Sequence, residues 1–325
     1  MTSTKLRTGF TIVELLTVMS IIIILMSVLV PGLARARRFA KVVTQKGQFN
    51  EISKGLELYR NDHQENYPDS GATDSCSTPN SYCGANKLCE ALLGQDGMGN
   101  SPVSNFQASQ PNTYLFDLCY ISSPTLYTGT SPSRPDLAAS IRDRNKYTDS
   151  ENIKAYRLQD IYNWPITSGA SFYTPSAIFT ANDGSATTPS TYPNAVIGDV
   201  FQKASINATH CPARAGQKVG MPVLYYKADS SKIAHDATTT PPATPNQNIY
   251  NFDDNYAITK LGCPWEGTLT THHPMYDDPR VFLNAITNDK VTSTPRPHNE
   301  DGYILMSAGW DGLYGTQDDV YNFAK

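Results

Sequence analysis

Three carboxylates near the C-terminus are the side chains whose type and spacing most suggest chemistry. Asp311, Asp318 and Asp319 lie among three glycines in the segment GWDGLYGTQDD. Glycine allows the sharp turns that expose backbone carbonyls, and carboxylates are the hard oxygen ligands that Ca²⁺ prefers. The spacing does not fit an EF-hand loop. The segment therefore indicates either a Ca²⁺ site or a solvated acidic turn.

Other candidate clusters give weaker signals for chemistry. The segment HHPMYDD at 272–278 contains metal-ligand types, but its spacing defines no known site and favours a polar surface loop. His210 stands directly before Cys211, and adjacent side chains rarely face each other as a nucleophile and its base. The chain has neither a glycine-rich phosphate loop nor a G-x-S-x-G elbow. These observations predict a protein without catalytic activity.

The chain contains six cysteines, all after the apolar N-terminal segment, and none spaced as C-x-x-C. An even number without zinc-ligand spacing favours disulfides in an oxidising compartment. Burial as free thiols is the alternative. Spacing does not choose among the roughly fifteen possible pairings. The candidate disulfide residues are Cys76, Cys83, Cys89, Cys119, Cys211 and Cys263.

An apolar segment at 10–30 contains a single charged residue, Glu14. As a helix this segment spans ~30 Å, which is the thickness of a bilayer core. It is longer than the apolar core of a secretory signal peptide, and no small-residue cleavage site follows it. A plain membrane anchor does not account for Glu14, because a carboxylate in an apolar helix costs roughly 2.5–3.5 kcal/mol.

The segment GFTIVELL at 9–16, with Lys5 and Arg7 before it, resembles the cleavage and methylation motif of type IV prepilins and type II secretion pseudopilins. The resemblance implies that a prepilin peptidase cuts between Gly9 and Phe10 and that the new amine is methylated. It also implies that Glu14 pairs with the amine of a neighbouring subunit and sets the register of a filament.

The C-terminal segment is similar to the calcium-binding loop of major pseudopilins of type II secretion. This resemblance implies Ca²⁺ ligands from Asp311, Asp318 and Asp319, with backbone carbonyls near Ala308 and Leu313. The chain departs from the family in having Gly-Thr-Gln before the acidic pair instead of a longer run rich in glycine and glutamate.

The helical pattern continues past the apolar segment. An apolar stripe at spacings of three, four and three predicts an amphipathic helix over 31–61, bent near Pro31 and ending before Tyr67-Pro68. The stripe consists of Phe49, Ile52, Leu56 and Tyr59.

The rest of the chain is rich in turn residues. The segment 68–150 is predicted to be a loop-rich insertion with a short helix at 87–93. It belongs to a predicted exported globular domain at 62–325, which ends in an acidic loop at 307–323. Strands are predicted at 177–180, 195–200, 222–227, 256–258 and 303–307. The prepilin resemblance adds an α+β, pilin-like fold, in which a long N-terminal helix packs on a small antiparallel sheet.

The net charge of −4 gives no sign of the basic face typical of nucleic-acid binders. The resemblance implies a bacterial inner-membrane protein with a leader at 1–9 and an extracytoplasmic C-terminal domain. The basic residues after the apolar segment outnumber those before it, which by the positive-inside rule favours a cytoplasmic domain instead.

The expected function is a structural subunit of a type II secretion pseudopilus, assembled with copies of itself or with other pilin-like subunits. One alternative is a type IV pilin for adhesion, motility or DNA uptake. The other, from a different class, is a membrane-anchored periplasmic enzyme or binding domain.

Overall fold

The structure is a computed structural model that describes residues 12–71, 82–94, 97, 99–101, 104, 106, 144–148, 153–162, 195–207, 214–238, 247–266, 272–291 and 294–324. The chain divides into two compact units, Met1–Val43 and Thr44–Lys325. The boundary between them falls inside one long helix.

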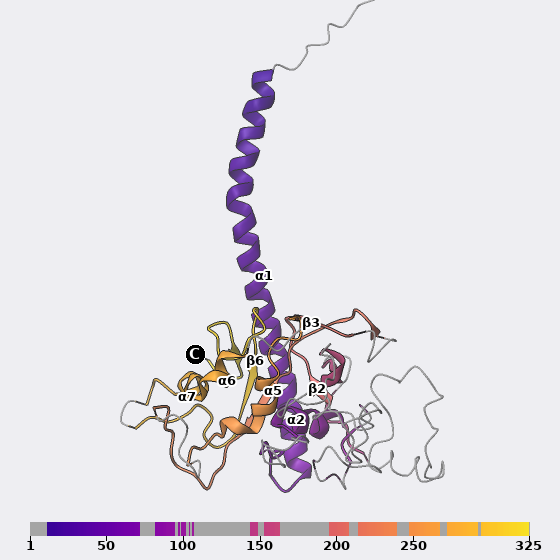
Figure 1. Cartoon of the computed structure of the whole chain (residues 1–325), viewed down its shortest axis with the longest axis vertical. Coiled ribbons are helices and arrows are strands. Elements are labelled where there is room, and N and C mark those ends of the chain that lie inside the picture. The colour runs from indigo at the N-terminus through magenta and orange to yellow at the C-terminus, as the bar shows by residue number, and fades with distance from the viewer. Residues whose placement is uncertain are drawn as a thin grey trace, which may run out of the picture. The chain divides into compact units, whose positions relative to one another are not determined.

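This helix, α1, spans Ile12–Asp62 without interruption (Figure 1). It confirms the predicted helix over 10–61 for the described residues. Pro31 lies inside the helix, where its ring removes one backbone hydrogen bond. The bend expected at this proline stays a prediction. Beyond the helix, Gln64 and Glu65 have left-handed φ angles of 54° and 62°, so the chain turns sharply.

The C-terminal half of α1 buries the predicted apolar stripe. Each of its four members is at most 5% exposed: Phe49, Ile52, Leu56 and Tyr59. Gly55 lies on the same buried face, and a Cβ atom there would approach Leu92 Cδ2 to 2.9 Å. A Cβ atom would also lie 3.1 Å from the Tyr147 carbonyl. Glycine therefore allows α1 to approach Leu92 and Tyr147 closely here.

Two buried glutamines extend this face and tie α1 to the segment 198–200. Gln48 donates from Nε2 to the carbonyl of Gly198 at 2.8 Å, and Val200 donates its N–H to Gln45 Oε1 at 2.9 Å. Gln45 also donates from Nε2 to Gln48 Oε1 at 2.9 Å. We call this arrangement the glutamine clamp. It satisfies amide groups that would otherwise be buried without partners.

Short antiparallel strands form the sheet part of the fold. β1 (Ala155–Arg157) pairs with β2 (Ala195–Ile197), and β3 (Ala204–Ser205) pairs with β4 (Lys218–Val219). A three-stranded sheet has the order β5 (Leu224–Lys227), β6 (Tyr303–Ser307), β7 (Val320–Tyr321). The predicted strands at 195–200, 222–227 and 303–307 contain β2, β5 and β6. The strand predicted at 177–180 lies outside the described residues.

The strand predicted at 256–258 is wrong, because these residues begin the helix α5 (Tyr256–Lys260). A 3₁₀ turn, η3 (Phe252–Asn255), precedes it, and the side chain of Asn251 caps this turn by accepting a hydrogen bond from the Asp253 N–H at 3.1 Å. Ala257 and Ile258 are both buried in the helical conformation. Packing and capping override the local strand preference of this short sequence.

The helix predicted at 87–93 is confirmed as α2 (Gly84–Leu93), and every residue in it is buried. Asn255 links α2 to the sheet, because its Oδ1 accepts from the Ala85 N–H at 2.9 Å and its Nδ2 donates to the Tyr225 carbonyl at 2.7 Å.

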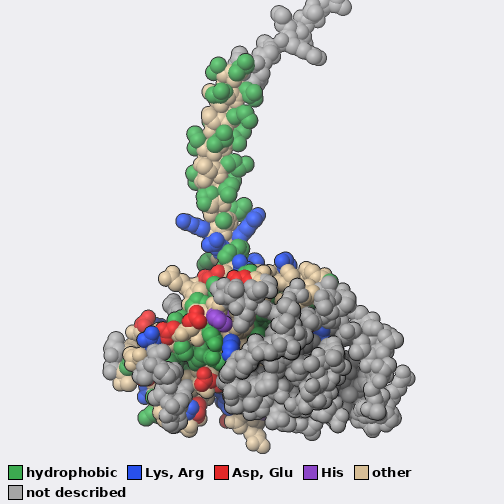
Figure 2. All heavy atoms as spheres, viewed as in Figure 1, with side chains coloured by type: hydrophobic (Ala, Val, Ile, Leu, Met, Phe, Trp, Pro, Cys, Tyr) green, Lys and Arg blue, Asp and Glu red, His purple; other side chains and the backbone are tan. Residues whose placement is uncertain are grey.

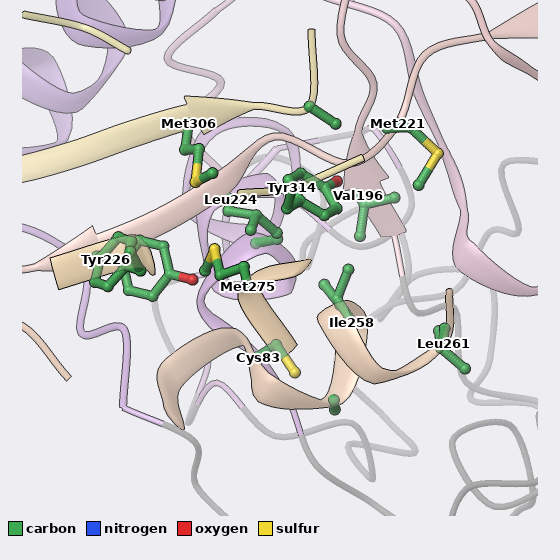
Figure 3. Packing of buried hydrophobic residues seen from close by; sticks show 14 of the residues in the cluster. Cys83, Val196, Met221, Leu224, Tyr226, Ile258, Leu261, Met275, Met306 and Tyr314 are labelled. Atoms are coloured by element: carbon green, nitrogen blue, oxygen red, sulfur yellow. The ribbon is translucent and has the colours of Figure 1, made fainter. Parts of the chain in front are cut away.

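One apolar core joins β5 and β6 with the later helices. α6 (Pro274–Asp277) and α7 (Pro279–Ile286) contribute Met275 and Phe282 to the buried cluster that also contains Ile304 of β6. Figure 1 labels both helices and β6. Figure 3 shows Met275, Leu224 and Tyr314 converging in the centre of this core. Tyr226 packs its ring against Phe282 with centroids 4.3 Å apart. The observed architecture is α+β, with one long N-terminal helix and small antiparallel sheets.

A buried polar cluster holds the chain that follows α1. Lys87 is 1% exposed and lies 3.1 Å from Asp69 Oδ2. Asp254 is 4% exposed and accepts a hydrogen bond from the Ser70 hydroxyl. Burial raises the pKa of Asp254 to about 7, with Asp69 and Asp253 adding to the rise, whereas Ser70 and Lys87 lower it.

The pKa of Asp254 predicts a pH-dependent stability. A carboxyl whose pKa is higher in the folded than in the unfolded state stabilises the protein at low pH, and this stabilisation is lost as pH rises through about 7. We expect Asp254→Asn to raise the melting temperature of the full chain in detergent micelles at pH 8.5, with little or no gain at pH 4. Asp301→Asn, at an exposed carboxylate, should change neither value. An equal effect of Asp254→Asn at both pH values would contradict the prediction.

The glutamine clamp predicts a cost for losing one amide. Gln48→Ala leaves the buried Gly198 carbonyl without the hydrogen bond from Nε2, at a cost of roughly 1–3 kcal/mol in the free energy of unfolding. Asn50→Ala, at an exposed site on the same helix, is the matched control and should stay within about 0.5 kcal/mol. Urea unfolding of the full chain in micelles, followed by tryptophan fluorescence, measures both. Equal stability of the two variants would show that the clamp contributes nothing.

Candidate functional site

The first candidate site is the N-terminal part of α1, in the unit Met1–Val43. Its apolar side chains are exposed around the whole helix, for example Ile12 at 82%, Val28 at 73% and Leu29 at 62%. Figure 2 shows green side chains along both edges of this part of the helix, with tan backbone and polar atoms between them. The helix is long and apolar enough to cross a membrane, by length and composition. Such a surface is stable only against lipid or other apolar helices.

Glu14 is the acidic residue in the first turn of α1, and its side chain is exposed. The N-terminal end of a helix carries a partial positive charge that favours a carboxylate there. The carbonyl of Glu14 accepts a hydrogen bond from Thr17 Oγ1 at 2.9 Å. Gly9 and Phe10, the predicted cleavage residues, lie outside the described residues.

The second candidate site is the acidic loop between β6 and β7. Gly309 has a φ of +66°, and a side chain there would collide with the backbone of Asp318. This close approach folds the loop back on itself. It brings Asp311 next to Asp318, whose Oδ2 accepts a hydrogen bond from the Asp311 N–H at 2.9 Å. The predicted loop at 307–323 therefore includes the end of β6, the turns that follow it, and β7.

Backbone N–H groups of the loop bind its own carboxylates. Asp311 Oδ1 accepts from Leu313 at 2.8 Å. Asp319 Oδ2 accepts from Gly315 at 2.9 Å and from Thr316 at 3.0 Å. The other carboxylate oxygen of Asp319, Oδ1, is buried and has no hydrogen-bond partner in the described part of the chain.

Burial makes the negative charge of this loop unfavourable. It raises the pKa of Asp319 to about 8, with contributions from Asp318 and Asp311. Burial and the neighbouring Asp318 also raise the pKa of Asp311. The pKa of Asp318 is lowered instead, because the effect of its burial is outweighed by hydrogen bonds from Thr316 and the backbone of Asp311. A cation bound here would remove the unfavourable interaction.

The loop has only part of a metal-ligand set. In the described ranges, no three His, Cys, Asp or Glu side chains are arranged to hold a metal ion together. Asp319 Oδ1 fits a cation, because it is an acceptor oxygen without a donor. Ca²⁺ at this position would need backbone carbonyls or water for much of its coordination shell.

The segment 272–278 is not the polar surface loop that its sequence suggested. His273 is fully buried, and its Nδ1 accepts a hydrogen bond from the Tyr314 N–H at 3.2 Å. Burial lowers the pKa of His273 to about 3, so the imidazole is neutral at ordinary pH. Asp278 caps α7 by accepting from the Arg280 N–H at 3.0 Å. These residues support the acidic loop and α7.

No disulfide bond joins any of the cysteines among the described residues. Cys89 and Cys263 have free thiols, and both are at most 2% exposed. Burial raises the pKa of Cys263 to about 11, so this thiol is unreactive. Cys83 is buried as well. The cysteines at 76, 119 and 211 lie outside the described residues, as does the histidine at 210, so any disulfide among them stays a prediction.

Sequence reasoning missed the link between the acidic loop and the glutamine clamp. Ser307, at the end of β6, donates from its hydroxyl to Asp199 Oδ2 at 2.8 Å, and Asp199 lies between the two backbone groups that the clamp binds. The spacing of Gln45 and Gln48 places both side chains on the apolar face of α1. This spacing could have indicated that both amides need buried hydrogen-bond partners.

The sequence matches no protein-family profile and no curated protein, and no solved structure matches the chain.

Proposed function

We propose that this protein is a structural subunit of a type II secretion pseudopilus. It is cut after Gly9 by a prepilin peptidase and assembles through its N-terminal helix with copies of itself or with other pilin-like subunits. Its C-terminal domain lies on the extracytoplasmic side of the bacterial inner membrane. The motif at 9–16 is the basis of the proposal.

The exposed apolar surface of α1 is the structural observation that supports assembly. A helix with apolar side chains on every face is stable in a bilayer, and equally among similar helices in a filament core. The same surface therefore serves the subunit before and after it leaves the membrane. The motif places one carboxylate in this surface, Glu14. In the filament it would pair with the α-amine of Phe10 on a neighbouring subunit, which cleavage after Gly9 creates.

The ion pair between Glu14 and the amine would contribute mainly to the specificity of the register between subunits. The attraction between Glu14 and an amine in a medium of low dielectric constant is strong, but removing both charges from water offsets much of it. An unpaired charge in the same place is costly, so registers that separate the two groups are disfavoured. Axial register in the filament is thus set by this ion pair.

We also propose that the acidic loop binds Ca²⁺. Asp311, Asp318 and Asp319 would be the carboxylate ligands, completed by backbone carbonyls near Ala308 and Leu313. Because these side chains are not arranged to hold an ion together in this structure, binding would have to move them. The ion would neutralise carboxylates whose charge burial disfavours. Its role is structural, because it would hold the chain between β6 and β7.

Processing and assembly can be tested together on protein from its native membrane. Intact mass and N-terminal sequencing of the wild type should show a chain that begins at N-methylated Phe10. Glu14→Ala should be processed and remain in the membrane fraction, but the yield of periplasmic filaments recovered from lysed cells should fall roughly tenfold, because one partner of a buried ion pair is lost.

Other starting residues would exclude this function. A start at Met1 would mean a plain anchored protein, and a start beyond Val30 a conventional signal peptide. Normal filament yield from Glu14→Ala would refute the register role of the ion pair. Long surface filaments in place of short periplasmic ones would identify the alternative, a type IV pilin.

Calcium removal provides the test of the acidic loop. Binding at about a hundred times the dissociation constant stabilises the folded state by about 2.7 kcal/mol. A chelator should therefore lower the melting temperature of the full chain in micelles by several degrees. Asp318→Ala should abolish this response, whereas Asp289→Ala, at an exposed carboxylate, should keep it. A wild-type melting temperature that is unchanged by chelator would exclude the ion.

A further inference from the structure

A band of positive charge follows the apolar part of α1. Three arginines are exposed there, and one lysine is half-buried. Figure 2 shows blue side chains gathered directly beyond the green apolar surface. We call this band the cationic collar; it consists of Arg35, Arg37, Arg38 and Lys41.

The collar occupies one side of the helix. At about 3.6 residues per turn, Arg37, Lys41 and Arg38 fall within a sector of roughly 100°, and Arg35 lies about 60° beyond Arg38. Phe39, exposed by 71%, lies only about 40° beyond Arg35, and Val43, exposed by 54%, about 80° beyond it. The segment 35–41 is therefore a cationic arc at the end of an apolar stretch.

The dimensions of α1 place the collar at a membrane surface. With a rise of about 1.5 Å per residue, the apolar segment 12–33 is ~33 Å long, close to the ~30 Å of a bilayer hydrocarbon core. The collar then covers the next ~9 Å of the helix axis, and a headgroup layer is ~5–8 Å thick on each side. Cations and phosphates would thus lie at the same depth.

We infer that the cationic collar binds the phosphate groups of anionic phospholipids. Arginine suits this ligand, because its planar guanidinium donates two parallel hydrogen bonds to one phosphate. The inference requires α1 to lie in a membrane, but it requires neither cleavage after Gly9 nor filament assembly. It applies to either orientation of the helix, because headgroups line both faces of a bilayer.

The test measures lipid preference with the full chain in nanodiscs of equal parts phosphatidylglycerol and phosphatidylcholine. Spin-labelled lipids report the relative association of each lipid with the protein. The wild type should prefer phosphatidylglycerol, and about 0.5 M NaCl should weaken this preference, because exposed charges are then screened.

Two matched double variants distinguish lipid binding by the collar from an effect of the net charge of the protein. Arg35→Gln with Arg37→Gln removes two collar cations and should lower the preference for phosphatidylglycerol about tenfold, since each cation near an anionic surface contributes several-fold to binding. Lys46→Gln with Lys54→Gln removes two exposed cations further along α1 and should change it less than twofold. Glutamine maintains helix propensity in all four positions.

Three outcomes would overturn the inference. The wild type could show no preference between the two lipids. The two double variants could lower the preference equally, which would indicate net charge alone. The collar variant could retain its lipid preference but lose self-association in chemical crosslinking, which would assign the collar to a second copy of the chain. An unchanged melting transition of the collar variant confirms that its fold is intact.

Discussion

The buried amides of Gln45 and Gln48 impose a constraint on which the fold of the C-terminal unit depends. A glutamine on the apolar face of a helix is tolerated only where its donors and acceptors find partners. The backbone at 198–200 supplies these partners. The residue between them, Asp199, accepts from Ser307 at the end of β6. One network of hydrogen bonds thus joins the first helix, the middle of the chain and the segment that leads into the acidic loop. Because Gln45, Gln48, Asp199 and Ser307 are buried, the loss of one of their bonds leaves another group unsatisfied.

The side chains of α1 change in character along its length. In the C-terminal half, small and polar residues are matched to particular neighbours, as Gly55 is to Leu92. In the N-terminal half the apolar side chains are exposed instead, for example Val28 at 73% and Leu29 at 62%. An apolar surface without specific contacts suits a fluid environment of lipid tails or a repeated packing of identical helices. The cations at 35–41 mark the end of this surface.

Local patterns in the sequence predicted the parts of the fold that depend on local order. The period of Phe49, Ile52, Leu56 and Tyr59 determines both the helix and its buried face, and five consecutive strand-forming residues predict β6. The prediction failed at 256–258, where an Asn251 cap and burial select a helix. It also failed for His273, because burial under Tyr314 depends on a contact 41 residues away. Long-range partners of this kind leave no periodic signal. The cleavage motif and the carboxylate ligands of the loop stay predictions.

The acidic loop shows why a sequence motif predicts a site better than it predicts ligand geometry. A cluster of carboxylates indicates a cation site, because a bound cation would offset the repulsion between their like charges. In the folded loop, however, backbone N–H groups already bind Asp311, Asp318 and Asp319 and offset part of this repulsion. Those bonds fix the carboxylates in positions from which no three of them, among the described residues, can hold an ion together. They leave Asp319 Oδ1 as a buried acceptor without a donor. The Ca²⁺ binding that we propose would therefore have to exchange some of these backbone bonds for contacts with the ion. Further oxygen ligands would come from backbone carbonyls or water.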